Sequence, residues 1–399
     1  MRISDIICTP VQSPGRTLVI IEVETDKGIT GVGEAGLQRR PLAIKGAVES
    51  LKKWMIGMDP MRIEHLWQNM ARGGFYPVDR LIGSVIAAID IALHDIKGQA
   101  LGVPVYELMG GRCRDYVECF FNPHYSVIDR GLSKAAAEAQ MRCIHSVDPA
   151  AWAELALICL DNGHKYFRWG PNERPDGIMD PRGSVRALIR QLEAVRKAVG
   201  DKMELMFDCH TRLNPPEAIF LCREAEKYGI LLVEDPIRAE YIQGYRHIRQ
   251  NTSVAIAAGE QWCSKWEFRQ VIEEDLIDYA RIDICIAGGL TEARKIASMC
   301  ETHYISILPH NPLGPVCLAA ALHLDLSSAN AGPQEVLFTP DTTLPDVFQC
   351  AFEIKDGKIM PPTAPGIGVR FDRKAAAKYP ADLTEPPHLA KEDGSYTNY

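Results

Sequence analysis

Six acidic or imidazole side chains recur at nearly constant spacing through the middle of this 399-residue chain. The first five follow the expected short strands, and successive members lie 26, 26, 23, 27 and 25 residues apart: Asp208, Glu234, Glu260, Asp283, His310 and Glu335. One strand–loop–helix–loop unit takes about that many residues, so every member falls at the same phase of its unit. In a barrel of such units, active residues lie at the carboxyl ends of the strands. We therefore expect the six side chains to face one mouth.

Three of the six are the carboxylates Asp208, Glu234 and Glu260. Three carboxylates that converge at a partly buried site cannot all remain ionised unless a cation compensates their charge. Oxygen ligands favour a hard divalent ion, and Mg²⁺ is the abundant one that keeps open positions for substrate and water. The sequence therefore predicts a Mg²⁺ site. The alternative is that each residue is a surface loop acid.

Two histidines stand beside these acids. A carboxylate that accepts a hydrogen bond from an imidazole fixes its tautomer and favours its protonated form, which predicts His310 with Asp283 as a general base. His210 lies two residues beyond Asp208, and the period of two in a strand would place both side chains on one face. His210 is therefore a candidate general acid. The alternatives are a structural histidine at 310 and a polar loop residue at 210.

The elements that must position these side chains alternate between short apolar strands and longer helices from about residue 115 to 337. Seven or eight such units favour a (β/α) barrel over an open sheet. The glycine pair at 288–289 lacks the G-x-G-x-x-G spacing, which disfavours a dinucleotide-binding fold. The expected strands are 116–121, 166–169, 204–207, 231–233, 255–258, 279–282 and 305–308.

The first 112 residues have a different pattern, typical of a small α+β domain. Two strand-like runs, 18–24 and 29–34, flank a turn that contains Gly28, which predicts a hairpin. Expected helices follow at 41–56, at 60–71 with Pro60 at the first helical position, and at 80–100. An Asp-Gly hairpin at 354–359 is expected to rejoin this domain. We thus expect a capping domain of 1–112, with a C-terminal return of about 345–399, and a barrel of 113–344.

Composition excludes several classes of protein. The formal net charge is −8, which disfavours a general nucleic-acid binder, and no apolar run reaches the roughly 20 residues of a membrane span. The charged start of the chain disfavours a cleaved signal peptide. Twelve cysteines occur without a C-x-x-C pair, which favours buried thiols in a reducing compartment. We therefore expect a cytoplasmic protein.

At these residues and motifs the sequence resembles members of the enolase superfamily, in its mandelate-racemase-like branch. The resemblance extends over nearly the whole chain. The resemblance implies an α/β fold: a (β/α)7β modified TIM barrel with an α+β N-terminal capping domain. Within the branch, the chain is similar to acid-sugar dehydratases. The stretches around Asp208, Glu234 and Glu260 resemble the mannonate dehydratases. The pair of Asp283 and His310 resembles the D-galactonate dehydratases, as do residues 73–76, 108–111, 309–315 and the C-terminal tail.

The resemblance implies a Mg²⁺-dependent loss of water from a sugar acid, an aldonate such as D-galactonate, to give a 2-keto-3-deoxy acid. His310, held by Asp283, would remove the C2 proton. The metal, and a hydrogen bond from a protonated Glu335, would stabilise the enediolate. His210 would then protonate the departing C3 hydroxyl.

Three arginines are candidate contacts to the substrate: Arg168, Arg281 and Arg16. Arg168 stands where the family usually has lysine, and a guanidinium stays protonated, so it can bind substrate but cannot act as a base. That argues against a two-base racemase. The mannonate dehydratases use an Arg/Tyr pair, and residues 169–176 offer no tyrosine. The alternative for these arginines is a solvated or structural charge.

Other functions stay open at this stage. They are a mannonate or gluconate dehydratase of the same superfamily, a sugar-acid racemase or epimerase, and a non-catalytic relative that binds sugar acids. A barrel metallohydrolase would require histidine-rich metal ligation, which the three carboxylates do not provide. The expected partner is a small-molecule sugar acid, with no nucleic acid and no membrane, and we expect a homo-oligomer.

Overall fold

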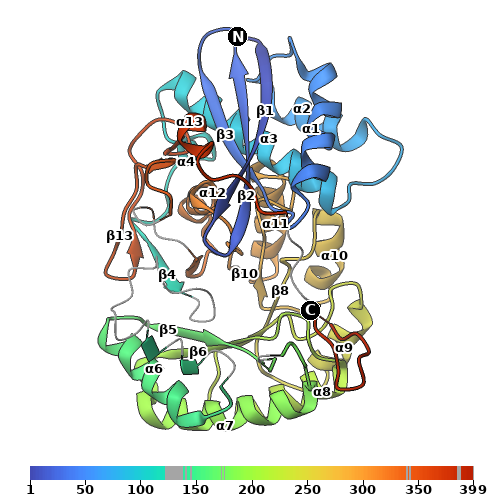
Figure 1. The fold of residues 1–399 in the computed structure, drawn as a ribbon, viewed down its shortest axis with the longest axis vertical. Helices are drawn as coiled ribbons and strands as arrows, with labels where there is room; N and C mark the ends of the chain where they lie inside the picture. Colours follow the sequence, from blue (N-terminus) through green and yellow to red (C-terminus); the bar gives the residue numbers. More distant parts are fainter. Residues whose placement is uncertain are drawn as a thin grey trace. The chain divides into compact units, whose positions relative to one another are not determined.

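The chain forms two compact units, which we describe one at a time in a computed structural model (Figure 1). Unit 1 comprises Met1–Cys119, Glu260–Ile272 and Arg281–Thr384, and unit 2 comprises Phe120–Gly259, Glu273–Ala280 and Glu385–Tyr399. These units do not follow the expected boundaries at 112/113 and 344/345, which stay a prediction. The structure describes all residues except 122–137, 140, 141, 144, 145, 172, 175, 338, 339, 341, 342, 384–387 and 399.

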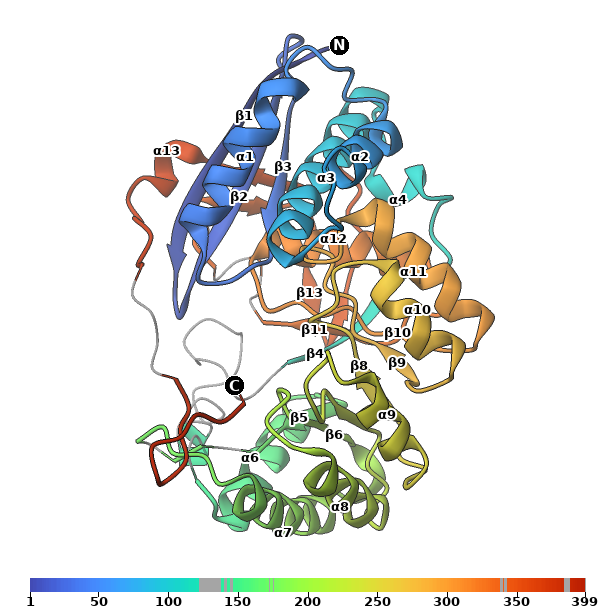
Figure 2. The ribbon, with the colours of Figure 1, turned by 90° about the vertical axis from the view of Figure 1, so that its right-hand side faces the viewer.

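Unit 1 begins with an antiparallel sheet covered by helices (Figure 2). Its apolar side chains and those of the helices share one buried core, as the expected hairpin and helices require. The expected helix start at Pro60 is wrong, because Pro60 lies in a turn and the helix begins at Ile63. The elements are β1 (Ile3–Ser13), β2 (Arg16–Thr25), β3 (Thr30–Ala35), α1 (Pro41–Met55), α2 (Ile63–Arg72) and α3 (Arg80–Leu101).

Two glycines allow β3 to lie directly against α3. A Cβ atom on Gly33 would stand 1.8 Å from the carbonyl oxygen of Ala88, and one on Gly31 would stand 2.0 Å from that of Ala92. Because successive residues of a strand point to opposite faces, the next residue, Glu34, points away from α3. The close approach of β3 to α3 therefore sets the direction of a buried carboxylate.

The C-terminal part of the chain completes unit 1. The Asp-Gly hairpin is confirmed: Ile354 pairs with Ile359, and both turn residues have positive φ. A carboxylate of α3, Asp95, accepts hydrogen bonds from the N–H groups of Val32 and Ile367 and so joins this segment to β3. The elements are α4 (Val105–Leu108), β4 (Val117–Phe121), α10 (Lys265–Glu273), α11 (Leu290–Thr302), β10 (Ser306–Ile307), α12 (Pro315–Leu326), β11 (Gln334–Val336), β12 (Phe348–Cys350), β13 (Ile354–Lys355), β14 (Lys358–Ile359), β15 (Val369–Phe371) and α13 (Arg373–Ala376).

Unit 2 contains a parallel sheet in the order β5–β6–β7–β8–β9, with helices between successive strands (Figures 1 and 2). Parallel neighbours joined by helices are what the alternating pattern predicts. The register makes Asp208 and Glu234 Cα partners at the carboxyl ends of two adjacent strands. The elements are α6 (Pro149–Asp161), β5 (Tyr166–Trp169), α7 (Pro181–Val199), a 3₁₀ helix (Gly200–Lys202), β6 (Glu204–Asp208), α8 (Pro215–Glu226), β7 (Leu232–Glu234), α9 (Ile242–Arg249), β8 (Ile256–Ala258) and β9 (Tyr279–Ala280).

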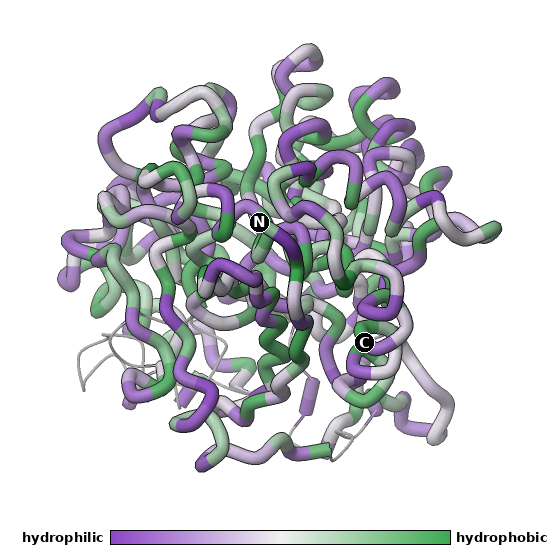
Figure 3. Tube along the Cα trace, turned by 90° about the horizontal axis from the view of Figure 1, so that it is seen from above, coloured by the Kyte–Doolittle hydropathy of each residue, from purple (hydrophilic) through white to green (hydrophobic). Residues whose placement is uncertain are grey.

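Hydrophilic and hydrophobic residues alternate along the helical turns, as amphipathic helices with one buried face require (Figure 3). Among the described residues, no helix is both long enough and apolar enough to cross a membrane. All twelve cysteines are free thiols, and nine of them are buried, as the absence of a C-x-x-C pair predicted.

We expect the substitution Gly33→Ala to destabilise the protein by several kcal/mol, because the new methyl group would collide with the backbone of α3. The matched control is Gly46→Ala, at an exposed position inside α1 with open space around it. Alanine there should stabilise the protein by about 0.5–1 kcal/mol, since it favours the helix. Urea unfolding of both variants measures the difference, and equal effects would contradict the close packing of β3 on α3.

Candidate active site

A hydrogen-bonded pair of Asp283 and His310 forms the centre of the site in unit 1. The two residues form a parallel β-bridge, and Nδ1 of His310 lies 3.0 Å from Oδ2 of Asp283. Oδ1 of Asp283 accepts the N–H groups of Cys285 and Ile286, at 2.8 and 3.1 Å, and only 1% of Asp283 is exposed. Because a carboxylate only accepts, Nδ1 of His310 is the donor in this pair, and Nε2 is the nitrogen turned away from Asp283. This is the arrangement of an imidazole that a buried carboxylate orients.

Glu260 approaches the same imidazole from its other side. Its Oε2 lies 3.3 Å from Nε2 of His310, and both side chains are mostly buried. Asp283 fixes the ring, whereas Glu260 stands at the nitrogen that would take a proton. Unit 1 therefore brings together three of the six predicted residues: Glu260, Asp283 and His310.

Glu335 supports this group from β11. Its Oε2 accepts hydrogen bonds from the guanidinium of Arg281 and from the N–H of Asn311, the latter at 3.1 Å. A carboxylate paired with a guanidinium is an acceptor, so this geometry does not favour the expected proton-donating role of Glu335. Instead, Glu335 holds the backbone of the residue that follows His310.

Arg281 is wholly buried, with 0% exposure, and it also donates to the carbonyl oxygens of Leu308 and Pro309. Its guanidinium therefore donates hydrogen bonds to a carboxylate and to two backbone carbonyl groups of the protein. The geometry favours the structural alternative for this arginine over a contact with substrate. Arg16, the third candidate, donates to the carbonyl oxygen of Pro312 and so lies beside the loop that follows His310.

The second group of predicted residues lies in unit 2. Asp208 and Glu234 end the adjacent strands β6 and β7, and both are buried. Arg168 of β5 donates to Oε2 of Glu234 and lies 3.5 Å from Oδ2 of Asp208. Its guanidinium also lies 5.3 Å from the centre of the Phe120 ring. The positive charge of Arg168 therefore compensates two of the three predicted metal ligands.

Strand alternation explains why Arg168 points at these carboxylates. Its neighbours Phe167 and Trp169 face Trp152 of α6, and Trp169 packs edge-on against Phe207. The aromatic side chains therefore fill the space under the helices, and Arg168 between them faces the opposite side of the sheet. Sequence reasoning assigned Arg168 to substrate, but it did not find this pairing with the carboxylates.

His210 reaches Asp208 by a turn and not by strand alternation. β6 ends at Asp208, and His210 has a left-handed backbone with φ 46°. Its N–H donates to Oδ1 of Asp208 at 3.1 Å, and its Nε2 lies 3.2 Å from Oδ2. The expectation that both side chains lie together is met, although the reason given for it, a continuing strand, is wrong.

The loop after β5, in which the sequence offers no tyrosine, is described only in part. Asn172 and Pro175, in the loop after β5, lie outside the described residues. The predicted metal ligands are divided between the units, with Asp208 and Glu234 in unit 2 and Glu260 in unit 1.

Sequence reasoning missed Glu34, a buried acid beside the dyad. Its carboxylate accepts the N–H groups of Gly314 and Cys317, both at 2.9 Å, at the start of α12. The first N–H groups of a helix lack partners within it, so Glu34 satisfies two of them. Burial raises the pKa of Glu34 to about 7, although these hydrogen bonds oppose the shift. The only signal in the sequence is an acid within a glycine-rich strand.

Comparison with known proteins identifies the fold and the relatives. Residues 7–110 match the model of the mandelate racemase/muconate lactonizing enzyme N-terminal domain, and residues 151–375 match that of the enolase C-terminal domain-like family. The chain is 35% identical to a D-mannonate dehydratase of Caulobacter sp. (strain K31), over 98% of both chains. It is 37% identical to a D-galactonate dehydratase of Ralstonia pickettii, over 89% of this chain and 88% of that one.

The solved structures agree with these matches. A crystal structure of an enolase from Pantoea ananatis, with bound D-gluconate and Mg, has a TM-score of 0.89 at 28% identity and covers both chains completely. A member of the enolase superfamily from Salmonella Typhimurium has a TM-score of 0.84 at 25% identity, over 96% of this chain and 99% of that one. The predicted fold class, an N-terminal capping domain with a barrel-type C-terminal domain, is confirmed.

We expect Glu335→Gln to destabilise the protein by about 3–5 kcal/mol, because it leaves the buried charge of Arg281 uncompensated. The matched control is Glu240→Gln, which removes the carboxylate from an exposed pair with Arg238 and should cost about 1 kcal/mol or less. Equilibrium unfolding in urea measures both variants. A loss at Glu335 no larger than that at Glu240 would show that Arg281 does not need this partner.

The raised pKa of Glu34 makes stability depend on pH. Between pH 4.5 and 7 the folded protein holds a proton at Glu34 that the unfolded chain has lost, so the free energy of unfolding should fall as pH rises through this window. Glu34→Gln cannot titrate. Relative to this variant, the wild type should therefore gain up to about 3 kcal/mol as pH falls from 8 to 5. Glu49→Gln, at an exposed position, is the control. If the free energies of unfolding of the wild type and Glu34→Gln change with pH in parallel, the raised pKa of Glu34 is contradicted.

Proposed function

The chain belongs to the mandelate racemase/muconate lactonizing enzyme family of the enolase superfamily, and on this premise we propose that it dehydrates a sugar acid to a 2-keto-3-deoxy acid in a Mg²⁺-dependent reaction. The observation that carries the proposal is the dyad: Asp283 holds Nδ1 of His310 at 3.0 Å and leaves Nε2 to accept a proton. The first substrate we propose is an aldonate such as D-galactonate. Relatives at 35–37% identity are named as dehydratases of D-galactonate and D-mannonate.

The residues fit a magnesium ion by their chemistry. Asp208, Glu234 and Glu260 supply three carboxylates at one phase of the β/α repeat, and carboxylate oxygen is the donor that Mg²⁺ prefers. Two of them are buried beside a guanidinium, which supports a need for positive charge at this place. When bound, Mg²⁺ would act as a Lewis acid that polarises the substrate carboxylate and makes the C2 proton more acidic.

His310 performs the first proton transfer in this proposal. Its Nε2 takes the proton from C2, and the electron pair of the C–H bond passes into the carboxylate to form an enediolate. The ring becomes an imidazolium, whose charge Asp283 balances through the hydrogen bond at Nδ1. Glu335 acts here as a positioning residue, because it holds the N–H of Asn311 next to His310.

His210 performs the second transfer. It gives a proton to the C3 hydroxyl as the C3–O bond breaks, so that water leaves and an enol remains, which then tautomerises to the 2-keto-3-deoxy acid. The carboxylate of Asp208 at 3.2 Å supports the protonated form of His210 that this step requires. One proton is removed and one is returned, so the net change is the loss of water.

The arginines receive different roles from those first expected. We propose that Arg168 compensates the carboxylates of Asp208 and Glu234 and that Arg281 serves Glu335, so neither selects the sugar through a free guanidinium. Arg16 remains a candidate contact for the substrate, because it lies beside the loop that follows His310. A cytoplasmic homo-oligomer also remains part of the proposal.

The experiment is a panel of aldonates and aldarates incubated with Mg²⁺ in D₂O, with NMR detection of both C2–H loss and 2-keto-3-deoxy product. Product from D-galactonate would support the first proposal, and product from D-mannonate or D-gluconate would move the assignment to that sugar. Exchange at C2 without product would favour an epimerase. Chelation of Mg²⁺ should abolish activity, and no exchange with any acid would contradict the proposal.

Two histidine variants separate the two proton transfers. His310→Asn should lose both C2 exchange and dehydration, by at least about 100-fold, because it removes the base. His210→Asn should lose dehydration by a similar factor and keep C2 exchange, because it removes only the acid. His65→Asn, at an exposed position on α2, is the control. Full exchange in His310→Asn would place the base elsewhere.

A further inference from the structure

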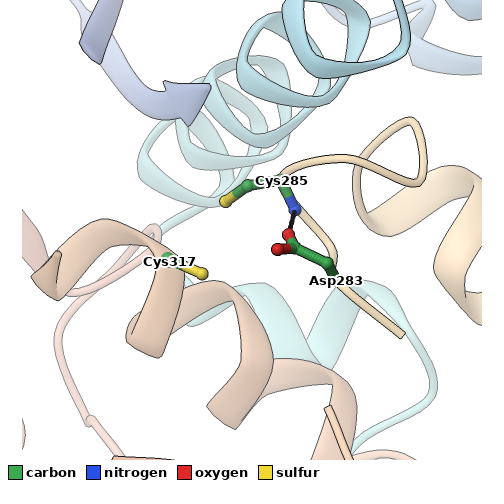
Figure 4. Close-up of side chains that lie close together, drawn as sticks. All are labelled: Asp283, Cys285 and Cys317. Carbon is green, nitrogen blue, oxygen red and sulfur yellow. Dashed lines mark hydrogen bonds between the residues drawn. The ribbon is translucent and has the colours of Figure 1, made fainter. Parts of the chain in front are cut away.

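Three buried side chains, one of them Asp283 of the dyad, form a cluster whose two thiols have no part in the proposed reaction. They are Asp283, Cys285 and Cys317, and one ligand atom from each lies within 4.8 Å of the other two. Figure 4 shows the two sulfur atoms and the carboxylate turned toward one another. Both thiols have 0% exposure. Two sulfur atoms and one carboxylate oxygen therefore converge on one small region inside unit 1.

Each backbone in this cluster is held without the help of the thiols. Cys285 follows Asp283 by two residues, and its N–H donates to Oδ1 of Asp283 at 2.8 Å, while its carbonyl accepts the N–H of Gly36. Cys317 lies in the first turn of α12, and its N–H donates to Glu34 at 2.9 Å. The sulfur positions are thus fixed by a turn and a helix cap, and a ligand would find them already arranged.

The donor set identifies the class of ligand. Cysteine sulfur is a soft ligand that selects Zn²⁺ and its heavier analogue Cd²⁺ over Mg²⁺, which prefers oxygen alone. Burial raises the pKa of Cys285 to about 11, so without an ion both thiols stay protonated and leave Asp283 undisturbed. A divalent ion would replace the two thiol protons, which pass to solvent, and form two thiolate bonds and one carboxylate bond. No electron transfer is involved.

We propose that Asp283, Cys285 and Cys317 form a binding site for a thiophilic divalent cation, Zn²⁺ or Cd²⁺, and that this ion switches off the His310 dyad. The inhibitory part of this proposal rests on the function proposed above. Asp283 stabilises the imidazolium that forms when His310 takes a proton. A cation on the same carboxylate opposes that stabilisation, whichever of its oxygen atoms it binds, because its positive charge lies beside the imidazolium that must form.

The test uses Cd²⁺, because thiolate–cadmium bonds give a charge-transfer absorption in the near ultraviolet. The full chain is titrated with Cd²⁺ in excess Mg²⁺, which occupies oxygen-only sites. The wild type should bind one Cd²⁺ per chain with this absorption, and Cys285→Ser and Cys317→Ser should each lose it. Cys300→Ser, a buried thiol on α11 outside the cluster, is the matched control and should keep it. Absence of the absorption in the wild type would overturn the site without reference to any variant.

The proposed inhibition is tested by measuring activity on the sugar acid that the aldonate and aldarate panel identifies as substrate. Cd²⁺ at saturation should lower the rate of the wild type at least about 100-fold, the scale of a lost general base. The double variant Cys285→Ser/Cys317→Ser should not respond to Cd²⁺. Inhibition that persists in the double variant, or that additional Mg²⁺ relieves, would place the ion at the magnesium ligands and overturn the switch. If no sugar acid is turned over, the absorption still decides the site, so the two proposals fail separately.

Discussion

Carboxylates removed from water are the constraint on which this site depends. Each of the buried acids named in either unit needs a donor or a positive charge, because an isolated buried charge is very costly. The chain meets this need in three ways: with a guanidinium, with backbone N–H groups and an imidazole, and with the start of a helix. The acids and their partners are Asp208 and Glu234 with Arg168, Glu335 with Arg281, Asp283 with His310 and two N–H groups, and Glu34 with α12.

These pairings limit what each residue can do. An arginine that compensates metal ligands holds a permanent charge, so it can neither accept a proton nor leave its carboxylates without cost. Glu335 accepts a hydrogen bond from Arg281 and another from the N–H next to His310, so it is suited to hold the backbone at that position. In the proposed reaction, the two proton transfers are therefore assigned to the two histidines, whose partners are carboxylates. The cluster of Asp283 with two thiols adds a place where a soft cation would compete for the same carboxylate.

Two histidines of unit 1 show that the neighbours of an imidazole limit what it can do. His323 accepts the N–H of Tyr106 at Nδ1 and donates to the carbonyl of Ile367 at Nε2, and burial lowers its pKa to about 4. Both of these hydrogen bonds are to backbone groups, which is the arrangement of a structural link. His310 has carboxylates on both ring nitrogens, at 3.0 and 3.3 Å, and is therefore the one suited to proton transfer.

The β/α repeat, the hairpins and the pairing of Asp283 with His310 were predictable from the amino-acid sequence alone. These depend on local period and on a spacing that places polar residues at strand ends, and both can be read along the chain. The folded structure alone shows the partners of Arg168, Arg281 and Glu335, because each partner lies on another segment of the chain, at a distance that spacing along the sequence does not give. It also decided that Glu34 caps α12 and that Cys317 meets Asp283. Residues far apart in the sequence become neighbours through packing, and no local pattern records that contact.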